Sequence, residues 1–290
     1  TAGFIGFAEK GSTQGAPLLV TNFKSFTRQF GGFLSEFTHG EYRYLANCVE
    51  QYFINGGTKC YVSRVVPSDA KKASVKAGIF SAEAANEGKW GNRIQISMNT
   101  VTKRKLQLIA SNQSGYVAKS VEGFKEGDLV EINGEYNKIR TIYDNSVTFE
   151  KEFTTDVVDA GIIPKTVLYL VTADISIRYN DEVEIYNEVS FNTASPYYIA
   201  SKLAVSELVK VQVEQLEEIG NPIEAILGKE MTSGMLCLEG GFDGTMENVN
   251  PGTFIGVDEG PGKRTGIQSF LENTLVSMMA IPGVTDPEVI

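Results

Sequence analysis

The segment 260–265 reads Gly-Pro-Gly-Lys-Arg-Thr and invites comparison with a loop that cradles phosphate groups. Such a loop needs a glycine, four residues, then Gly-Lys and a Ser or Thr whose hydroxyl binds Mg²⁺. Counting back from Gly262 places Val257 where the first glycine belongs, and Arg264 stands where the hydroxyl belongs. Both ends of the motif fail. The sequence therefore predicts a tight loop leading into a helix from Thr265, not a nucleotide site.

Two further candidates for chemistry are weak. Gly3 and Gly6 lie on an apolar strand, but their spacing is wrong for a dinucleotide-binding turn, which also needs a third glycine and a helix. His39 is the only histidine, so nucleophilic catalysis with a histidine base would have to use it. It stands between Thr38 and Gly40, which predicts a surface loop just before a helix. A metal site needs several ligands at chelating spacing, and the sequence offers none.

The acidic side chains of Glu214, Glu217 and Glu218 form a cluster on a polar stretch. Acid–base catalysis needs two carboxylates in different environments within a cleft, and a run of this kind is the pattern of a solvated face. We therefore expect no catalytic, cofactor-binding or metal site, and no cofactor.

Charge and apolar run length limit the partners of the 290-residue chain. The formal net charge is −10, and the longest basic cluster is 103–105, so direct nucleic-acid binding and attraction to anionic membranes are not expected. The longest apolar runs, such as 276–281, are far too short to insert across a bilayer. Three cysteines without a Cys-x-x-Cys spacing predict reduced, free thiols: Cys48, Cys60 and Cys237.

The elements of residues 1–66 alternate between strand and helix. After an apolar strand at 3–8, Asn22 is expected to cap a helix that ends at Gly31. Apolar residues at helical spacing predict a second helix from about Glu41 to Phe53, and residues 59–66 read as a strand. This order favours an α/β layer with parallel strands.

Residues 67–90 are rich in Ala, Ser and Lys and read as a helix with a linker. Strand signals then dominate up to about residue 192, with Asn133-Gly134 as a hairpin turn and a small barrel expected around 115–160. From Ser195 a capped helix returns, Val209 to Val213 alternate as a half-buried strand, and 276–281 reads as a strand buried on both faces.

The predicted fold is a discontinuous α/β core domain with an inserted β-rich domain. The core comprises residues 1–88 and 193–290, and the insertion comprises residues 89–192. Residues 3–8 already read as a strand, and Pro287 stands in the first turn of a helix. We therefore expect the chain to be a segment of a longer protein whose core continues.

Several of these segments, taken in order, resemble the tail sheath proteins of contractile phages and of related injection systems. The segments that carry the resemblance are 1–11, 20–23 with 30–32, 53–57 with 60–65, 90–92, 238–244, 260–266 and 280–287. The turns that match the family are structural: Gly56, Gly57, Gly240, Gly241, Asp243, Gly244, Gly260 and Gly262. Residues 100–165 match least.

The resemblance implies a non-enzymatic role. Sheath subunits polymerise as stacked six-fold rings around an inner tube and contract to drive the tube through a target cell envelope. The implied partners are copies of the chain itself, the inner tail tube protein, and the baseplate and tail terminator proteins. The implied location is the tail of a phage or phage-like particle assembled in the bacterial cytoplasm. Two alternatives remain: a receptor-binding surface module built on the β-rich region, and a nucleotide hydrolase using residues 256–266.

Overall fold

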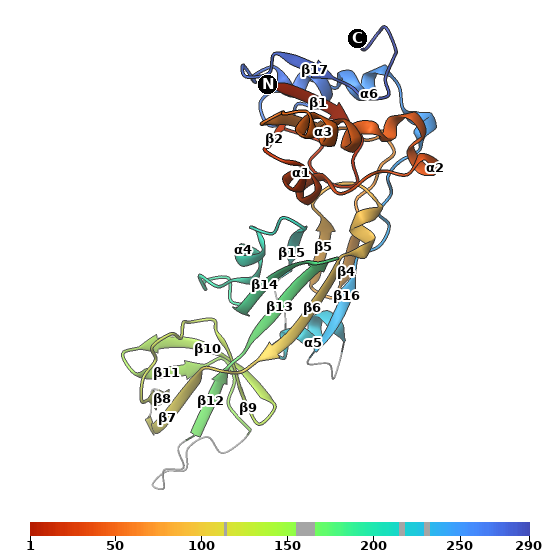
Figure 1. Ribbon diagram of the computed structural model, residues 1–290. Helices are drawn as coiled ribbons and strands as arrows, with labels where there is room; N and C mark the ends of the chain where they lie inside the picture. Colours follow the sequence, from red (N-terminus) through yellow and green to blue (C-terminus); the bar gives the residue numbers. More distant parts are fainter. Residues whose placement is uncertain (113–114, 155–165, 215–217, 229–232) are drawn as a thin grey trace. The chain divides into compact units, whose positions relative to one another are not determined.

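The computed structural model describes residues 1–112, 115–154, 166–214, 218–228 and 233–290 (Figure 1). The chain forms two compact units. The first combines residues 1–74, 84–93 and 238–290, and the second combines residues 75–83 and 94–237. Residues 193–237 thus lie in the second unit together with the β-rich region.

The first unit contains a four-stranded sheet in the order β17-β1-β3-β2. Its strands are β1 (Ala2–Gly6), β2 (Leu18–Val20), β3 (Cys60–Arg64) and β17 (Met278–Ala280). β1 pairs in parallel with both β3 and β17, and β2 pairs antiparallel with β3. The expected parallel pairing of the first strand with the strand at 59–66 is therefore confirmed.

Helices cover both faces of this sheet. The α-helices of the unit are α1 (Phe23–Phe30), α2 (Glu36–His39), α3 (Leu45–Ile54) and α6 (Pro251–Ile255). Short 3-10 helices are η1 (Gly40–Tyr44), η2 (Lys89–Arg93), η3 (Met246–Asn248) and η4 (Gly266–Phe270). Asn22 caps α1 as expected, since its side chain accepts a hydrogen bond from the Ser25 amide at 2.7 Å.

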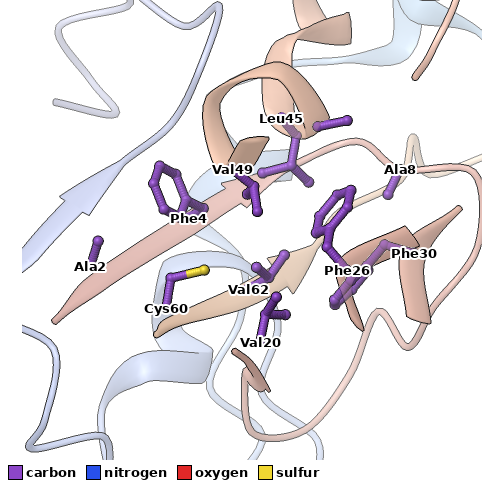
Figure 2. Close-up of a cluster of buried hydrophobic side chains, with 11 residues drawn as sticks. Ala2, Phe4, Ala8, Val20, Phe26, Phe30, Leu45, Val49, Cys60 and Val62 are labelled. Atoms are coloured by element: carbon purple, nitrogen blue, oxygen red, sulfur yellow. The ribbon is translucent and has the colours of Figure 1, made fainter. Parts of the chain in front are cut away.

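Alternation along β1 gives each face its own core. Phe4 and Val62 face one way and pack with Phe26 of α1 and Val49 of α3 (Figure 2). Ile5 faces the other way and joins a cluster that includes residues of α6 and η4. Because successive strand side chains point to opposite faces, one apolar strand serves both layers.

The second unit contains a four-stranded antiparallel sheet in the order β14-β13-β6-β16. The strands are β6 (Gln95–Val101), β13 (Thr172–Tyr179), β14 (Glu182–Val189) and β16 (Ser233–Cys237). A three-stranded sheet in the order β15-β5-β4 lies in the same unit, with β4 (Ser74–Ala77), β5 (Phe80–Ala84) and β15 (Val209–Val213). Two short helices accompany them: α4 (Ile199–Leu203) and α5 (Pro222–Leu227).

A closed six-stranded barrel completes the second unit. Its strands are β7 (Lys105–Asn112), β8 (Gly115–Ala118), β9 (Leu129–Ile132), β10 (Glu135–Tyr143), β11 (Ser146–Phe149) and β12 (Thr166–Leu170). The barrel order β10-β11-β8-β7-β12-β9 places β12 beside β9, so β9 to β12 form a Greek key. Asn133, at φ 51°, and Gly134, at φ 84°, make the expected hairpin turn between β9 and β10.

Three expectations fail. Within residues 67–90, the β4–β5 hairpin forms instead of a helix, and the alternate side chains Phe80, Ala82 and Ala84 of β5 are buried. Ser195 does not cap α4, whose N-terminal flanking residue is Tyr198. The strand at 276–281 shrinks to β17 and is not buried on both faces, since it lies at a sheet edge with Met278 60% exposed. The α/β expectation thus describes the first unit, while most of the remaining structure is β.

Candidate functional site

The first unit is organised around a buried charge. Arg64 ends β3 and is 1% exposed. Its guanidinium donates hydrogen bonds to the backbone oxygens of Ala8, Gly11 and Glu87, each at 2.9 Å. Burial lowers the Arg64 pKa to about 10, partly offset by the carboxylate of Glu87, so the group still carries its charge at neutral pH. Arg64 therefore ties the chain after β1 to the segment before η2.

The Gly-Gly-Phe-Asp-Gly turn at 240–244 lies in the same unit and is hydrogen-bonded to η2. The amide side chain of Asn92 accepts from the Gly241 amide at 2.7 Å and donates to the Gly241 oxygen at 2.9 Å. A Cβ on Gly241 would lie 2.5 Å from the Gly88 oxygen, so a larger residue has no room there. Two separate segments of the resemblance, 90–92 and 238–244, thus form one junction.

Asp243 has a different partner from the one its turn predicted. A carboxylate at this point was expected to bond its own local backbone. Instead its Oδ1 accepts the amide hydrogen of Lys89 at 2.7 Å, 154 residues away along the sequence. The side chain therefore fixes the start of η2 and has a structural role.

His39 was expected in a surface loop, and this is wrong. The residue ends α2, is 6% exposed, and its ring centroid lies 6.2 Å from that of Phe7. Nδ1 lies 2.8 Å from the Thr38 hydroxyl. Burial lowers the His39 pKa, although Asp243 acts in the opposite direction, so the imidazole is neutral at pH 7.

A cavity of about 430 Å³ adjoins His39 and is also lined by Glu9, Lys89, Arg93 and Asp243. The two acidic and two basic side chains on its wall balance in charge, and the hydroxyl beside the imidazole comes from the adjacent Thr38. That contact is local and does not form the nucleophile–base–carboxylate relay of the triad hydrolases.

The remaining matched glycines serve turns. Gly56 has φ 91° and follows α3, and a Cβ on Gly57 would collide with the ring of Tyr52. Gly260 and Gly262 have φ 95° and 79° and shape the loop after α6. All four positions thus act through backbone conformation or close packing.

The Gly-rich loop is held by its own side chains. Arg264 donates from Nε to Asp258 and from Nη1 to Glu272, both at 2.6 Å. The Thr265 hydroxyl accepts from the Val257 amide at 2.9 Å. The helix that follows this loop is the 3-10 helix η4, and Thr265 is its N-terminal flanking residue. Two carboxylates beside the one guanidinium repel an anion, so the loop is unsuited to phosphate.

The acidic and sulfur groups lie apart. Glu214 pairs with Lys76 at 3.1 Å, and the expected cluster member Glu217 lies outside the described residues. Cys48, Cys60 and Cys237 are free thiols. In the part of the chain that the structure describes, no three potential metal ligands come together, and no helix is long and apolar enough to cross a membrane.

Sequence reasoning missed Arg64 and Asn92, the two residues that hold this junction. Arg64 carried one usable signal: a charged residue at the end of an apolar strand implies either an exposed strand end or a fully hydrogen-bonded buried charge. The choice between the two depended on carbonyl groups supplied by residues 8–11 and 87.

Comparison with known proteins gives no assignment. No family model and no curated protein matches the chain. Two solved structures are similar: a sheath tail protein from Listeria innocua, 13% identical with a TM-score of 0.42, and one from Desulfitobacterium hafniense, 12% identical with a TM-score of 0.38. In each case 88% of this chain is covered, and it spans 36% and 37% of those proteins respectively. At these values the two structures do not assign a function to this chain.

Proposed function

We propose that this chain is part of a structural subunit of a contractile tail sheath. The subunit would polymerise as stacked six-fold rings around an inner tube and contract to drive that tube through a cell envelope. The proposal starts from the ordered sequence resemblance. It is supported by the way segments 1–11, 60–65, 90–92 and 238–244 contribute to one junction in the first unit.

The observation that carries the proposal is the edge of the first unit's sheet. β17 is an edge strand with Met278 60% and Met279 42% exposed, and β2 is the opposite edge with Leu19 45% exposed. Edge strands of monomeric proteins are usually protected by charges, prolines or a covering element. Apolar edges of this kind suit β-augmentation, in which a neighbouring chain adds a strand.

The proposed domain organisation is a core of residues 1–88 and 193–290 with residues 89–192 inserted. Support for a core built from both ends of the chain comes from β1, which pairs in parallel with β17. Within the proposed insertion, β6 leads into the barrel and β13 leads out of it, and these strands pair antiparallel with Val101 opposite Thr172. Such adjacent entry and exit points are what an inserted module requires, so they support insertion of the barrel itself.

In this proposal contraction is a re-docking of folded subunits onto new contacts, while strand pairing keeps the subunits linked. Copies of the chain, the inner tube protein, and the baseplate and terminator proteins are the proposed partners. A net charge of −10 per chain opposes close packing unless charges are complementary at the contacts.

Negative-stain microscopy of the gene product that contains residues 1–290 tests the proposal. We expect hollow tubes with six-fold symmetry. The variant Met278→Lys places a charge on the exposed edge and should reduce tube formation without unfolding the protein. The control is Val205→Lys, which makes the same kind of change at a 76% exposed position of the second unit.

Particles without rings or tubes under all assembly conditions would refute the sheath proposal. Tubes that form equally well with Met278→Lys would keep the sheath role but remove β17 as a joint.

A further inference from the structure

A second cavity, of about 270 Å³, lies within the second unit, where the barrel meets the segment that follows β14. Its charged and aromatic lining residues are Arg104, Phe124, Lys125, Asp128, Glu188 and Tyr197. The volume is just below the roughly 300 Å³ at which pockets for drug-sized molecules begin, so the space suits a single small ring.

Hydrogen bonds hold the cavity wall in place. Asp128 is 4% exposed, and its carboxylate accepts from the Lys125 amide at 2.8 Å and from Asn192 Nδ2 at 2.7 Å. The same Asn192 nitrogen donates to the Glu126 oxygen at 2.9 Å. Glu188 adopts φ 51°, a conformation that non-glycine residues rarely take, and its amide donates to Asp174 at 2.8 Å. The wall is thus preformed rather than loose.

The lining combines opposite charges with an aromatic surface. Arg104 and Lys125 are balanced by Asp128 and Glu188, so a charged ligand gains no net attraction. In the described part of the chain, the polar contacts of the Arg104 guanidinium are long: 3.5 Å to the Gly123 oxygen and 3.7 Å to Glu188. Guanidinium hydrogens therefore remain available to a ligand oxygen.

Aromatic and hydroxyl groups complete the wall. The guanidinium carbon of Arg104 lies 5.9 Å and Lys202 Nζ lies 4.7 Å from the Tyr197 ring centroid, and these contacts hold the ring. Ser190 and Ser195 add hydroxyl groups to the lining. Fixed donors, fixed acceptors and aromatic carbon in one small space match a molecule whose hydroxyls both donate and accept and whose ring carbons are apolar.

We propose that this cavity binds one neutral monosaccharide unit. A sugar hydroxyl can donate to a carboxylate while accepting from a guanidinium or ammonium group. A neutral sugar therefore uses the charged groups of both signs without adding a charge of its own. The inference goes beyond the proposed sheath role and does not depend on it. Sugar titration and tube microscopy are separate measurements, so each proposal can fail alone.

The test is saturation-transfer NMR followed by calorimetric titration of the full chain with glucose, galactose, mannose and N-acetylglucosamine. At least one should bind with a Kd on the order of 1 mM, the strength expected of a single small polar ring. Tyr197→Ala and Arg104→Gln should each weaken binding about tenfold or more. Tyr197→Phe, which keeps the ring, should stay within about twofold of the native protein.

The control variant is Tyr143→Ala, since Tyr143 is 78% exposed at the end of β10 and does not line the cavity. It should leave binding unchanged. Glucuronate serves as a charged probe and should bind no more tightly than the neutral sugars. The proposal is overturned if none of the four sugars binds at about 20 mM, roughly twenty times the expected Kd. The proposal is also overturned if folded Tyr197→Ala and Arg104→Gln both bind sugar as tightly as the native protein, or if glucuronate binds more tightly than the neutral sugars. Circular dichroism identifies a variant that fails to fold, in which case the remaining variant decides.

Discussion

Replacing Arg64 by methionine should destabilise the first unit more than any exposed substitution. The guanidinium satisfies three buried backbone oxygens at 2.9 Å, belonging to Ala8, Gly11 and Glu87. Each buried acceptor left without a donor costs about 1–3 kcal/mol. At about 2 kcal/mol each, the three oxygens together cost roughly 6 kcal/mol.

Removing the buried charge offsets part of that loss of stability. The Arg64 pKa falls from 12.5 to about 10, mainly because burial disfavours the charged form. This shift corresponds to roughly 3 kcal/mol of destabilisation from burying the charge, which the methionine variant does not have. The methionine side chain also occupies much of the space of the arginine stem. The expected net loss for Arg64→Met is therefore about 3 kcal/mol.

Urea unfolding followed by tryptophan fluorescence measures this loss. Trp90 is the only tryptophan, is 2% exposed, and donates to the Glu87 oxygen at 3.1 Å, so its emission reports the first unit. With an m-value of about 2 kcal/mol per molar, the midpoint should fall by roughly 1.5 M. The midpoint of Arg64→Lys should lie between those of the native protein and Arg64→Met, because an ammonium group lacks the fork geometry of a guanidinium.

The matched control is Arg28→Met, an exposed arginine on α1 of the same unit. Its midpoint should move by less than about 0.25 M. If Arg64→Met shifts the midpoint no more than this control, the three oxygens find other donors, and Arg64 does not organise the junction.

Three further predictions follow from the same structure. Lys263→Ala should leave the fold intact and change no nucleotide binding; micromolar ATP binding by calorimetry that vanishes in the variant would contradict this. In native protein the exposed thiol of Cys237 should react with iodoacetamide first. Cys48 and Cys60 should be labelled mainly after denaturation, because burial raises the pKa of both thiols and takes that of Cys60 to about 12. A disulfide found by mass spectrometry in freshly isolated protein would refute the prediction of free thiols. Because burial lowers the folded-state pKa of His39, the unfolded chain takes up this proton first, so the free energy of unfolding should fall as pH drops from about 6.5 toward the lowered pKa. Urea titrations of His39→Gln should show less of this loss. Identical pH profiles for the native protein and the variant would disprove the role of His39 in the pH dependence.

The sequence alone determined the features that depend on neighbours along the chain. Asn22 caps its helix because its side chain reaches an amide three residues away. Asn133 and Gly134 turn a hairpin because both tolerate positive φ. The alternation from Val209 to Val213 marks a strand with one buried face. Each of these signals acts over a few residues, and local geometry suffices to read it.

Only the tertiary structure decided the features that depend on distant partners. Asn92 and Gly241 exchange two hydrogen bonds across 149 residues, and Arg64 draws its acceptors from two separate segments. His39 is buried because Phe7 lies against it, and Met278 is exposed because β17 takes an edge instead of the centre of its sheet. Burial and hydrogen bonding between distant residues depend on which surfaces meet, and the residue types of one segment do not contain that information.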